Sequence, residues 1–127
     1  MYFHYTPISW ATHMGHVKIV QLLLEQEGID INKGDGGYPP LNVAAWYGHS
    51  DIALLFLKRE EIDINKARAF GYTALICATH RRHSGVARLL LEKDEIDINK
   101  MVNSSNGPAA KLPAWSARRI LLNLTKN

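Results

Sequence analysis

The sequence of 127 residues contains a single cysteine, Cys77, so no disulfide bond can form within the chain. Long apolar runs are also missing: the longest, such as residues 52–57, fall far short of the roughly 20 residues of a membrane-spanning helix. The first residues include neither a basic cluster nor the apolar stretch of a secretory signal. These absences exclude a transmembrane protein and favour a reducing, intracellular location, cytoplasmic or nuclear.

Acidic residues are missing between Asp63 and Glu92 and again after Asp97. Residues 1–63 carry four Lys or Arg against eight Asp or Glu, whereas residues 64–127 carry eleven against four. Such asymmetry is compatible with a surface for an acidic partner, and equally with an ordinary solvated surface. The composition, 46% hydrophobic and 21% charged, is typical of one globular domain.

Internal repetition dominates the rest of the sequence. The tetrapeptide Ile-Asp-Ile-Asn occurs at residues 29–32, 62–65 and 96–99, which gives a period of 33 to 34 residues. In such arrays each unit buries its apolar surface only against its neighbours. Further residues recur at one offset in every unit: Tyr5, Tyr38 and Tyr72; Ala11, Ala44 and Ala78; His16, His49 and His83; Leu22, Leu55 and Leu89; and Leu24, Leu57 and Leu91.

The first unit shows the local structure expected of each repeat. Thr6 is placed to cap a short helix whose first turn contains Pro7, and Gly15 is suited to end it in the left-handed conformation. Residues 17–25 have apolar side chains at helical spacing, which predicts a second helix. The alternation in residues 29–32 predicts extended chain. Each unit is therefore expected to be helix, turn, helix and then a projecting, hairpin-like loop.

These units resemble the ankyrin repeat, whose T-P-L-H-x-A signature is similar to residues 6–11, 39–44 and 73–78. The Gly-His turn of that family is similar to residues 15–16 and 48–49, and its leucine-rich second helix and A-D-V-N segment also have counterparts in every unit. The resemblance covers residues 5–100. It implies an all-α ankyrin-repeat solenoid of helix-turn-helix units with projecting hairpin loops, divided at about residues 5–37, 38–71 and 72–100.

Two positions depart from the pattern in ways that bear on stability. In the second unit Pro39 stands where a capping threonine belongs. In the third unit Arg82 replaces the glycine of the turn, and a left-handed conformation there costs roughly 1 kcal/mol or more for a residue with a Cβ atom.

The two ends of the array are expected to differ. Residues 101–111 predict a loop, and residues 112–127 predict a degenerate terminal repeat or capping helix. At the other end, apolar side chains such as Phe3 and Trp10 would lie near an open edge. Either the chain is a fragment of a longer array, or residues 1–5 fold over that edge.

Several residue pairs have the spacing of a metal or catalytic site, but the repeat favours a structural role for them. His13 with His16, and His80 with His83, have the H-x-x-H spacing of a metal pair, yet no further ligands accompany them. Cys77 and His80 are three residues apart, but the Cys77 offset is an apolar core position in the other units. We therefore expect no metal, no cofactor and no enzymatic activity.

The family resemblance implies a concave groove, lined by hairpin tips and by the ends of the first helices, that binds partner proteins. Trp10, Phe56 and the leucines are expected in the core instead. Carried over by position, the partner-binding residues are His13 and Met14 from the first unit, Tyr38, Trp46 and Tyr47 from the second, and Arg68, Phe70, Tyr72, His80 and Arg81 from the third, with Tyr5 and Asp35 beside them.

The function implied by the resemblance is a non-catalytic protein–protein interaction module, expected to be a monomer. Trp46 and Tyr47 would make central apolar contacts, and Arg68 and Arg81 would pair with carboxylates or phosphates. One alternative is a structural spacer within a longer array. Another is binding of an acidic partner or nucleic acid through the basic half, by Lys66, Arg68, Arg81, Arg82, Arg88, Arg118 and Arg119.

Overall fold

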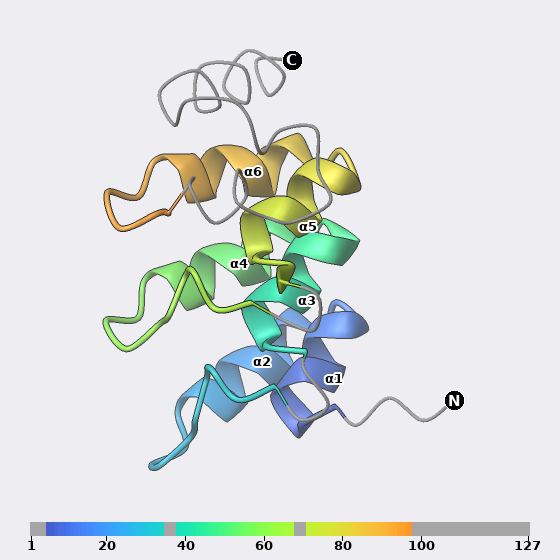
Figure 1. Cartoon of the computed structure of the whole chain (residues 1–127). Helices are drawn as coiled ribbons and strands as arrows, with labels where there is room; N and C mark the ends of the chain where they lie inside the picture. Colours follow the sequence, from blue (N-terminus) through green and yellow to red (C-terminus); the bar gives the residue numbers. More distant parts are fainter. Residues whose placement is uncertain (1–4, 35–37, 68–70, 98–127) are drawn as a thin grey trace.

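The computed structural model describes residues 5–34, 38–67 and 71–97, and these contain six helices arranged as three pairs. The first helices of the pairs stack on one another, as do the second helices, which gives two layers (Figure 1). This arrangement confirms the all-α fold of helix-turn-helix units; residues 98–127, with their expected loop and capping helix, lie outside the described residues. The pairs are α1 (Pro7–His13) with α2 (Val17–Leu24), α3 (Pro40–Tyr47) with α4 (Ser50–Leu57), and α5 (Ala74–His80) with α6 (Ser84–Leu91).

The starts of the first helices follow from their capping residues. The Thr6 hydroxyl accepts a hydrogen bond from the Ser9 N–H at 3.2 Å, and the Thr73 hydroxyl accepts one from the Ile76 N–H at 3.3 Å. Each bond satisfies one of the backbone donors left unpaired in a first turn. Pro39 makes no such bond at the start of α3, so the departure noted in the sequence leaves this helix without a side-chain cap.

The Ile-Asp-Ile-Asn segments are not extended, so that prediction was wrong for the two copies that the structure describes in full. The Asp30 carboxylate accepts a hydrogen bond from the Asn32 N–H at 3.0 Å, and Asp63 does the same with Asn65 at 3.1 Å. An aspartate side chain that binds the backbone two residues ahead favours a turn over extended chain. The alternation of apolar and polar residues instead places Ile31 in the core while the aspartates remain exposed.

The asparagine that ends each tetrapeptide joins its unit to the next one. Its side-chain amide donates to a backbone carbonyl of the following loop and accepts from an N–H two residues further on. Since one planar amide makes both bonds, the loops are held in a single register. The bonds are Asn32 Nδ2 to Glu61 O and Asp63 N to Asn32 Oδ1, both 2.7 Å, Asn65 Nδ2 to Glu95 O, 2.8 Å, and Asp97 N to Asn65 Oδ1, 2.7 Å.

The core runs along the stack between the two helix layers. Phe56 and Cys77 are fully buried in it, as expected, and so are the leucines at the offset of Leu24. At the other repeated leucine offset, Leu55 and Leu89 pack against the core as expected, whereas Leu22 is 59% exposed. A repeated residue therefore does not by itself indicate burial.

Trp10 was also expected in the core, and the structure contradicts this, since 55% of its surface is exposed. Its equivalents Val43 and Cys77 are buried, because this offset faces the preceding unit in the stack. No unit in the described part of the chain precedes α1. The repeat pattern therefore assigned Trp10 to an interface that the first unit does not form.

Arg82 adopts the left-handed conformation expected of it, with a φ angle of 60°, at the offset where Gly15 and Gly48 have φ angles of 74°. We predict that Arg82→Gly raises the free energy of unfolding by about 1 kcal/mol and the melting temperature by about 3–6 °C, because glycine adopts this conformation without a Cβ clash. Thermal denaturation followed by circular dichroism measures the change. The matched control is Arg81→Gly, at a φ angle of −90°, which should lower stability; an unchanged or lower melting temperature for Arg82→Gly would contradict the prediction.

Candidate functional site

One surface of the stack is formed by the first helices and by the residues that precede them. It consists of three rows, each contributed by equivalent positions in the three units. We call it the first-helix face. Its rows are Tyr5, Tyr38 and Tyr72; His13, Trp46 and His80; and Met14, Tyr47 and Arg81. The face brings together most of the residues predicted to bind a partner; Arg68, Phe70 and Asp35 lie outside the described residues.

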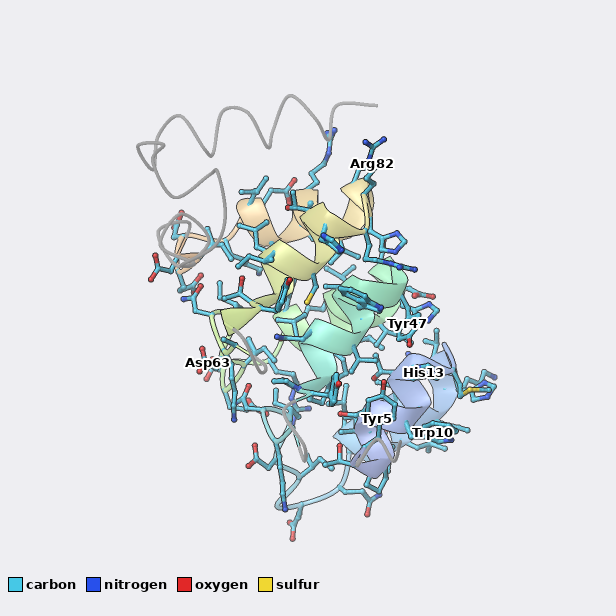
Figure 2. The ribbon with its side chains drawn as sticks, turned by 45° about the vertical axis from the view of Figure 1, so that its right-hand side comes forward. Tyr5, Trp10, His13, Tyr47, Asp63 and Arg82 are labelled. Carbon is cyan, nitrogen blue, oxygen red and sulfur yellow. The ribbon has the colours of Figure 1, made fainter. Side chains whose placement is uncertain are left out.

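Near α1 the face is a cluster of aromatic rings (Figure 2). Tyr5 lies 5.5 Å from His13 and 5.6 Å from Tyr38, measured between ring centroids. His13 stacks on Trp10 at 5.3 Å and meets the edge of Tyr47 at 4.4 Å. Such ring pairs stabilise one another beyond their burial, so this end of the face is preformed and apolar.

Near α5 the face has a different character. The Trp46 indole stacks on the His80 ring, with centroids 5.6 Å apart and planes inclined by 19°. The Arg81 guanidinium carbon lies 4.9 Å from the Trp46 ring centroid, within the range of a cation–π interaction. A guanidinium held over a ring keeps its N–H edge available to other acceptors, so Trp46 supports a positioned cation.

Hydrogen bonds between units hold the backbone behind this face. His83 Nε2 donates to the Trp46 carbonyl at 2.9 Å, and His49 Nε2 donates to the His13 carbonyl at 3.3 Å. Because a carbonyl only accepts, both Nε2 atoms carry the proton in these bonds. The repeated histidines of the Gly-His turn therefore have the structural role expected of them, and no group of three potential metal ligands occurs among the described residues.

The tyrosine row is held in a similar way. The Ser9 hydroxyl donates to the Tyr38 carbonyl at 3.1 Å, and the Asn42 amide donates to the Tyr72 carbonyl at 2.9 Å. Ser9 and Asn42 occupy the position of the signature histidine, so a short polar side chain there still links consecutive units. The first-helix face is thus supported by hydrogen bonds beneath its first and second rows.

Exposure differs among the predicted residues. Met14 is 50% exposed and Tyr47 38% exposed, and Arg81 is also exposed, so all three are accessible. Trp46 and Tyr72 pack partly against the core and present only part of their rings. Trp10 was not among the residues predicted to bind a partner, yet it belongs to the aromatic cluster. Its exposure follows from its place in the first unit, at the open edge that the sequence indicated.

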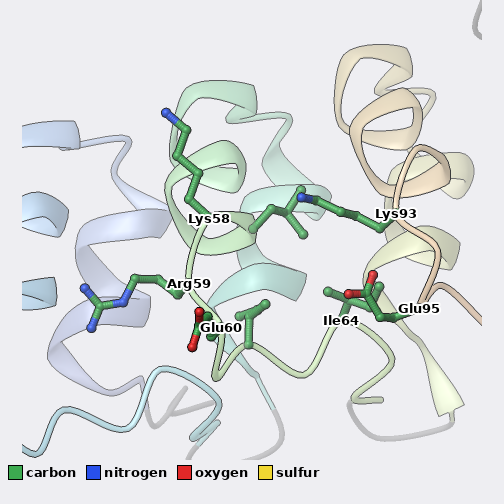
Figure 3. Close-up of a pocket in the computed structure, with 8 residues that line it drawn as sticks. Lys58, Arg59, Glu60, Ile64, Lys93 and Glu95 are labelled. Atoms are coloured by element: carbon green, nitrogen blue, oxygen red, sulfur yellow. The ribbon is translucent and has the colours of Figure 1, made fainter.

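A second candidate is a shallow pocket of about 290 Å³ between the segments that follow α4 and α6 (Figure 3). Lys58 and Arg59 point away from it, whereas Lys93 extends across it. Arg59 forms an ion pair of 3.0 Å with Glu61, whose pKa is lowered by a backbone hydrogen bond and by Arg59. Charges of both signs surround this pocket, so it favours no ligand class. It is lined by Leu57, Lys58, Arg59, Glu60, Ile62, Ile64, Lys93 and Glu95.

Helical pairs stacked in register define the class of repeat solenoids. Family comparison assigns the particular class: a model for ankyrin repeats in three copies matches residues 2–68, and a model for a single ankyrin repeat matches residues 70–103. The chain therefore belongs to the ankyrin-repeat family. No curated protein matches it. Among the described residues, no helix is both long enough and apolar enough to cross a membrane.

Proposed function

We propose that this chain is a non-catalytic protein–protein interaction module that binds its partner through the first-helix face. The observation that carries the proposal is the arrangement around Trp46, whose ring contacts both His80 and Arg81 on a backbone held by His83. Ankyrin repeats generally mediate protein interactions, which agrees with this assignment. The single buried cysteine supports an intracellular site of action.

Residue type and rigidity both favour binding at this face. Trp, Tyr and Arg dominate the energetically important positions of protein interfaces, and all three types occur together on this face. Stacked rings and inter-unit hydrogen bonds restrict these side chains before a partner arrives. Less conformational entropy is then lost on association, so more of the contact energy remains as affinity.

The test is a comparison between the wild-type chain and Trp46→Ala. If Trp46 is central to the interface, truncation should weaken binding by about 2 kcal/mol, which is close to a thirtyfold loss of affinity. Affinity capture from a cell lysate, followed by mass spectrometry, identifies proteins retained by the wild type and lost by the variant. The affinity for a retained protein is then measured directly.

Two further variants make this comparison specific. Tyr47→Ala removes an exposed ring of the same face and should also weaken capture, whereas Leu54→Ala removes an exposed apolar side chain of α4 and should not. Circular dichroism establishes that each variant is folded. Equal capture by the wild type and by both face variants would place the binding site elsewhere, and an absence of any specific protein would favour the spacer interpretation.

A further inference from the structure

The first-helix face changes in charge from one end to the other. In its third row, Arg81 of the third unit occupies the position that Met14 and Tyr47 have in the first two units. Arg82 occupies the position of the turn glycines Gly15 and Gly48. Both arginines therefore occur only in the third unit, Arg81 in the face itself and Arg82 directly after it. Figure 2 places Arg82 at the end of the stack away from Tyr5 and the aromatic cluster.

Neither cation is neutralised by the described part of the chain. Arg81 and Arg82 are exposed, and no carboxylate among the described residues forms an ion pair with either of them. The reason is visible in the sequence, since no acidic residue occurs between Asp63 and Glu92. A cationic surface without internal counter-charges attracts an acidic partner and steers its approach.

Arg82 also retains a strained backbone at this position. Its φ angle of 60° is one that glycine adopts more cheaply, and glycine stands at this offset in the other two units. Strained conformations concentrate at positions where a side chain serves binding. Arg82 thus directly follows Arg81, whose guanidinium lies over Trp46, at a cost to stability.

We propose that the partner is an extended, acidic protein segment that lies across the first helices in a defined order. An Asp or Glu of the segment meets Arg81 and Arg82, and an apolar or aromatic side chain meets the ring cluster near α1. This inference rests on the proposed function, because it specifies the partner of the same face.

The geometry sets the spacing within the segment. Packed helices lie about 8–10 Å apart, and an extended chain of the polyproline II type advances about 3.1 Å per residue with about three residues per turn. Consecutive units are therefore separated by about three residues of the partner, whose side chains face the same side. The acidic side chain should therefore stand about three residues from the one that contacts Tyr47, and about six from the one at the α1 cluster.

The described cations favour a protein partner over a nucleic acid. Nucleic-acid binding requires a series of cations along a phosphate backbone. On the first-helix face the described guanidinium groups are confined to the third unit, while the rows of the first two units carry aromatic rings and a thioether. A segment with one acidic end and one apolar end matches this distribution.

The experiment begins with a random dodecapeptide library displayed on phage and selected on the folded full chain. Selected peptides should be enriched in Asp or Glu placed about three and about six residues from aromatic or large apolar residues. One such peptide, labelled with fluorescein, is then titrated with the chain and its variants by fluorescence anisotropy. Arg81→Gln and Arg82→Gly should each lower its affinity about tenfold. Lys58→Gln, which removes a cation of the second-helix layer, is the matched control and should change the affinity less than twofold.

A peptide in which Gln replaces the acidic residue completes the design. It should bind the wild type about as weakly as the original peptide binds Arg81→Gln, with little further loss when both changes are combined. Arg82→Gly is especially informative, because it is expected to raise stability while it lowers affinity, and structural damage cannot produce that pair of results. Selection of no peptides, or of peptides without acidic enrichment, would overturn the proposal.

The remaining outcomes separate this inference from the function on which it rests. If Trp46→Ala abolishes peptide binding while Arg81→Gln and Arg82→Gly leave it unchanged, the face binds protein but the acidic partner is wrong. If Trp46→Ala leaves peptide binding unchanged, both proposals fail at this face. A fluorescein-labelled single-stranded oligonucleotide that binds more tightly than the peptide would assign the two arginines to nucleic-acid binding and overturn the inference.

Discussion

Phe56→Ala should lower the free energy of unfolding by about 3–5 kcal/mol, because it empties the largest fully buried side-chain site in the described core. Small domains are stable by only about 5–15 kcal/mol, so the variant is expected to be partly unfolded near physiological temperature. The position is also critical within the stack. Phe56 lies on α4, which packs between α2 and α6, so the cavity weakens both of the interfaces that couple the units.

Urea denaturation followed by circular dichroism measures this loss. The control is Leu54→Ala on the same helix, where the side chain is 39% exposed, and the expected change is below about 1 kcal/mol. A smaller denaturant slope for Phe56→Ala, together with the lower midpoint, would show that the units no longer unfold together. Equal losses for the two variants would contradict the burial that the structure assigns to Phe56.

The second large effect is expected at Gly48, where alanine should cost about 2–3 kcal/mol. The φ angle of Gly48 is 74°, and an added Cβ atom would lie 2.5 Å from Nδ1 of the His83 ring. Two penalties therefore combine: the left-handed backbone strain, and the displacement of the ring that donates to the Trp46 carbonyl at 2.9 Å. The variant should also weaken partner binding, since that hydrogen bond holds the backbone of Trp46.

Gly28→Ala isolates the first penalty. Its φ angle is 75°, and nothing lies within 4 Å of an added Cβ atom, so only backbone strain of about 1 kcal/mol is expected. The difference between the two variants, measured by thermal or urea denaturation, is the contribution of the contact with His83. If both glycine variants lose the same stability, the packing of His83 against the turn contributes nothing measurable.

Features set by residues close together in the sequence were predicted well. Thr6 and Thr73 cap their helices, and Arg82 adopts the left-handed conformation, because each depends on a few neighbouring backbone groups. The Ile-Asp-Ile-Asn segments show the limit of such reasoning. Alternation favoured extended chain, but the hydrogen bond from the Asn32 N–H to the Asp30 carboxylate prevailed.

The candidate site was predicted as a set of positions rather than as a geometry. Offsets within the repeat place His13, Trp46 and His80 in one row, so their common face could be expected. The stacking of Trp46 on His80 and the guanidinium of Arg81 above it involve two different units, and the sequence contains no signal for the rotamers that bring them together. Trp10 was misassigned for a related reason, since burial at its offset requires a preceding unit.

The sequence by itself determined the period, the helical pairs, the family and the contrast between an aromatic and a basic end. These follow from residue order, because helix formation, capping and turn conformation act over a few residues at a time. The tertiary structure alone decided which apolar side chains are buried, how the asparagine and histidine side chains join consecutive units, and which rings meet on the first-helix face. Those outcomes depend on contacts between residues about 30 positions apart, and such contacts exist only once the units have stacked.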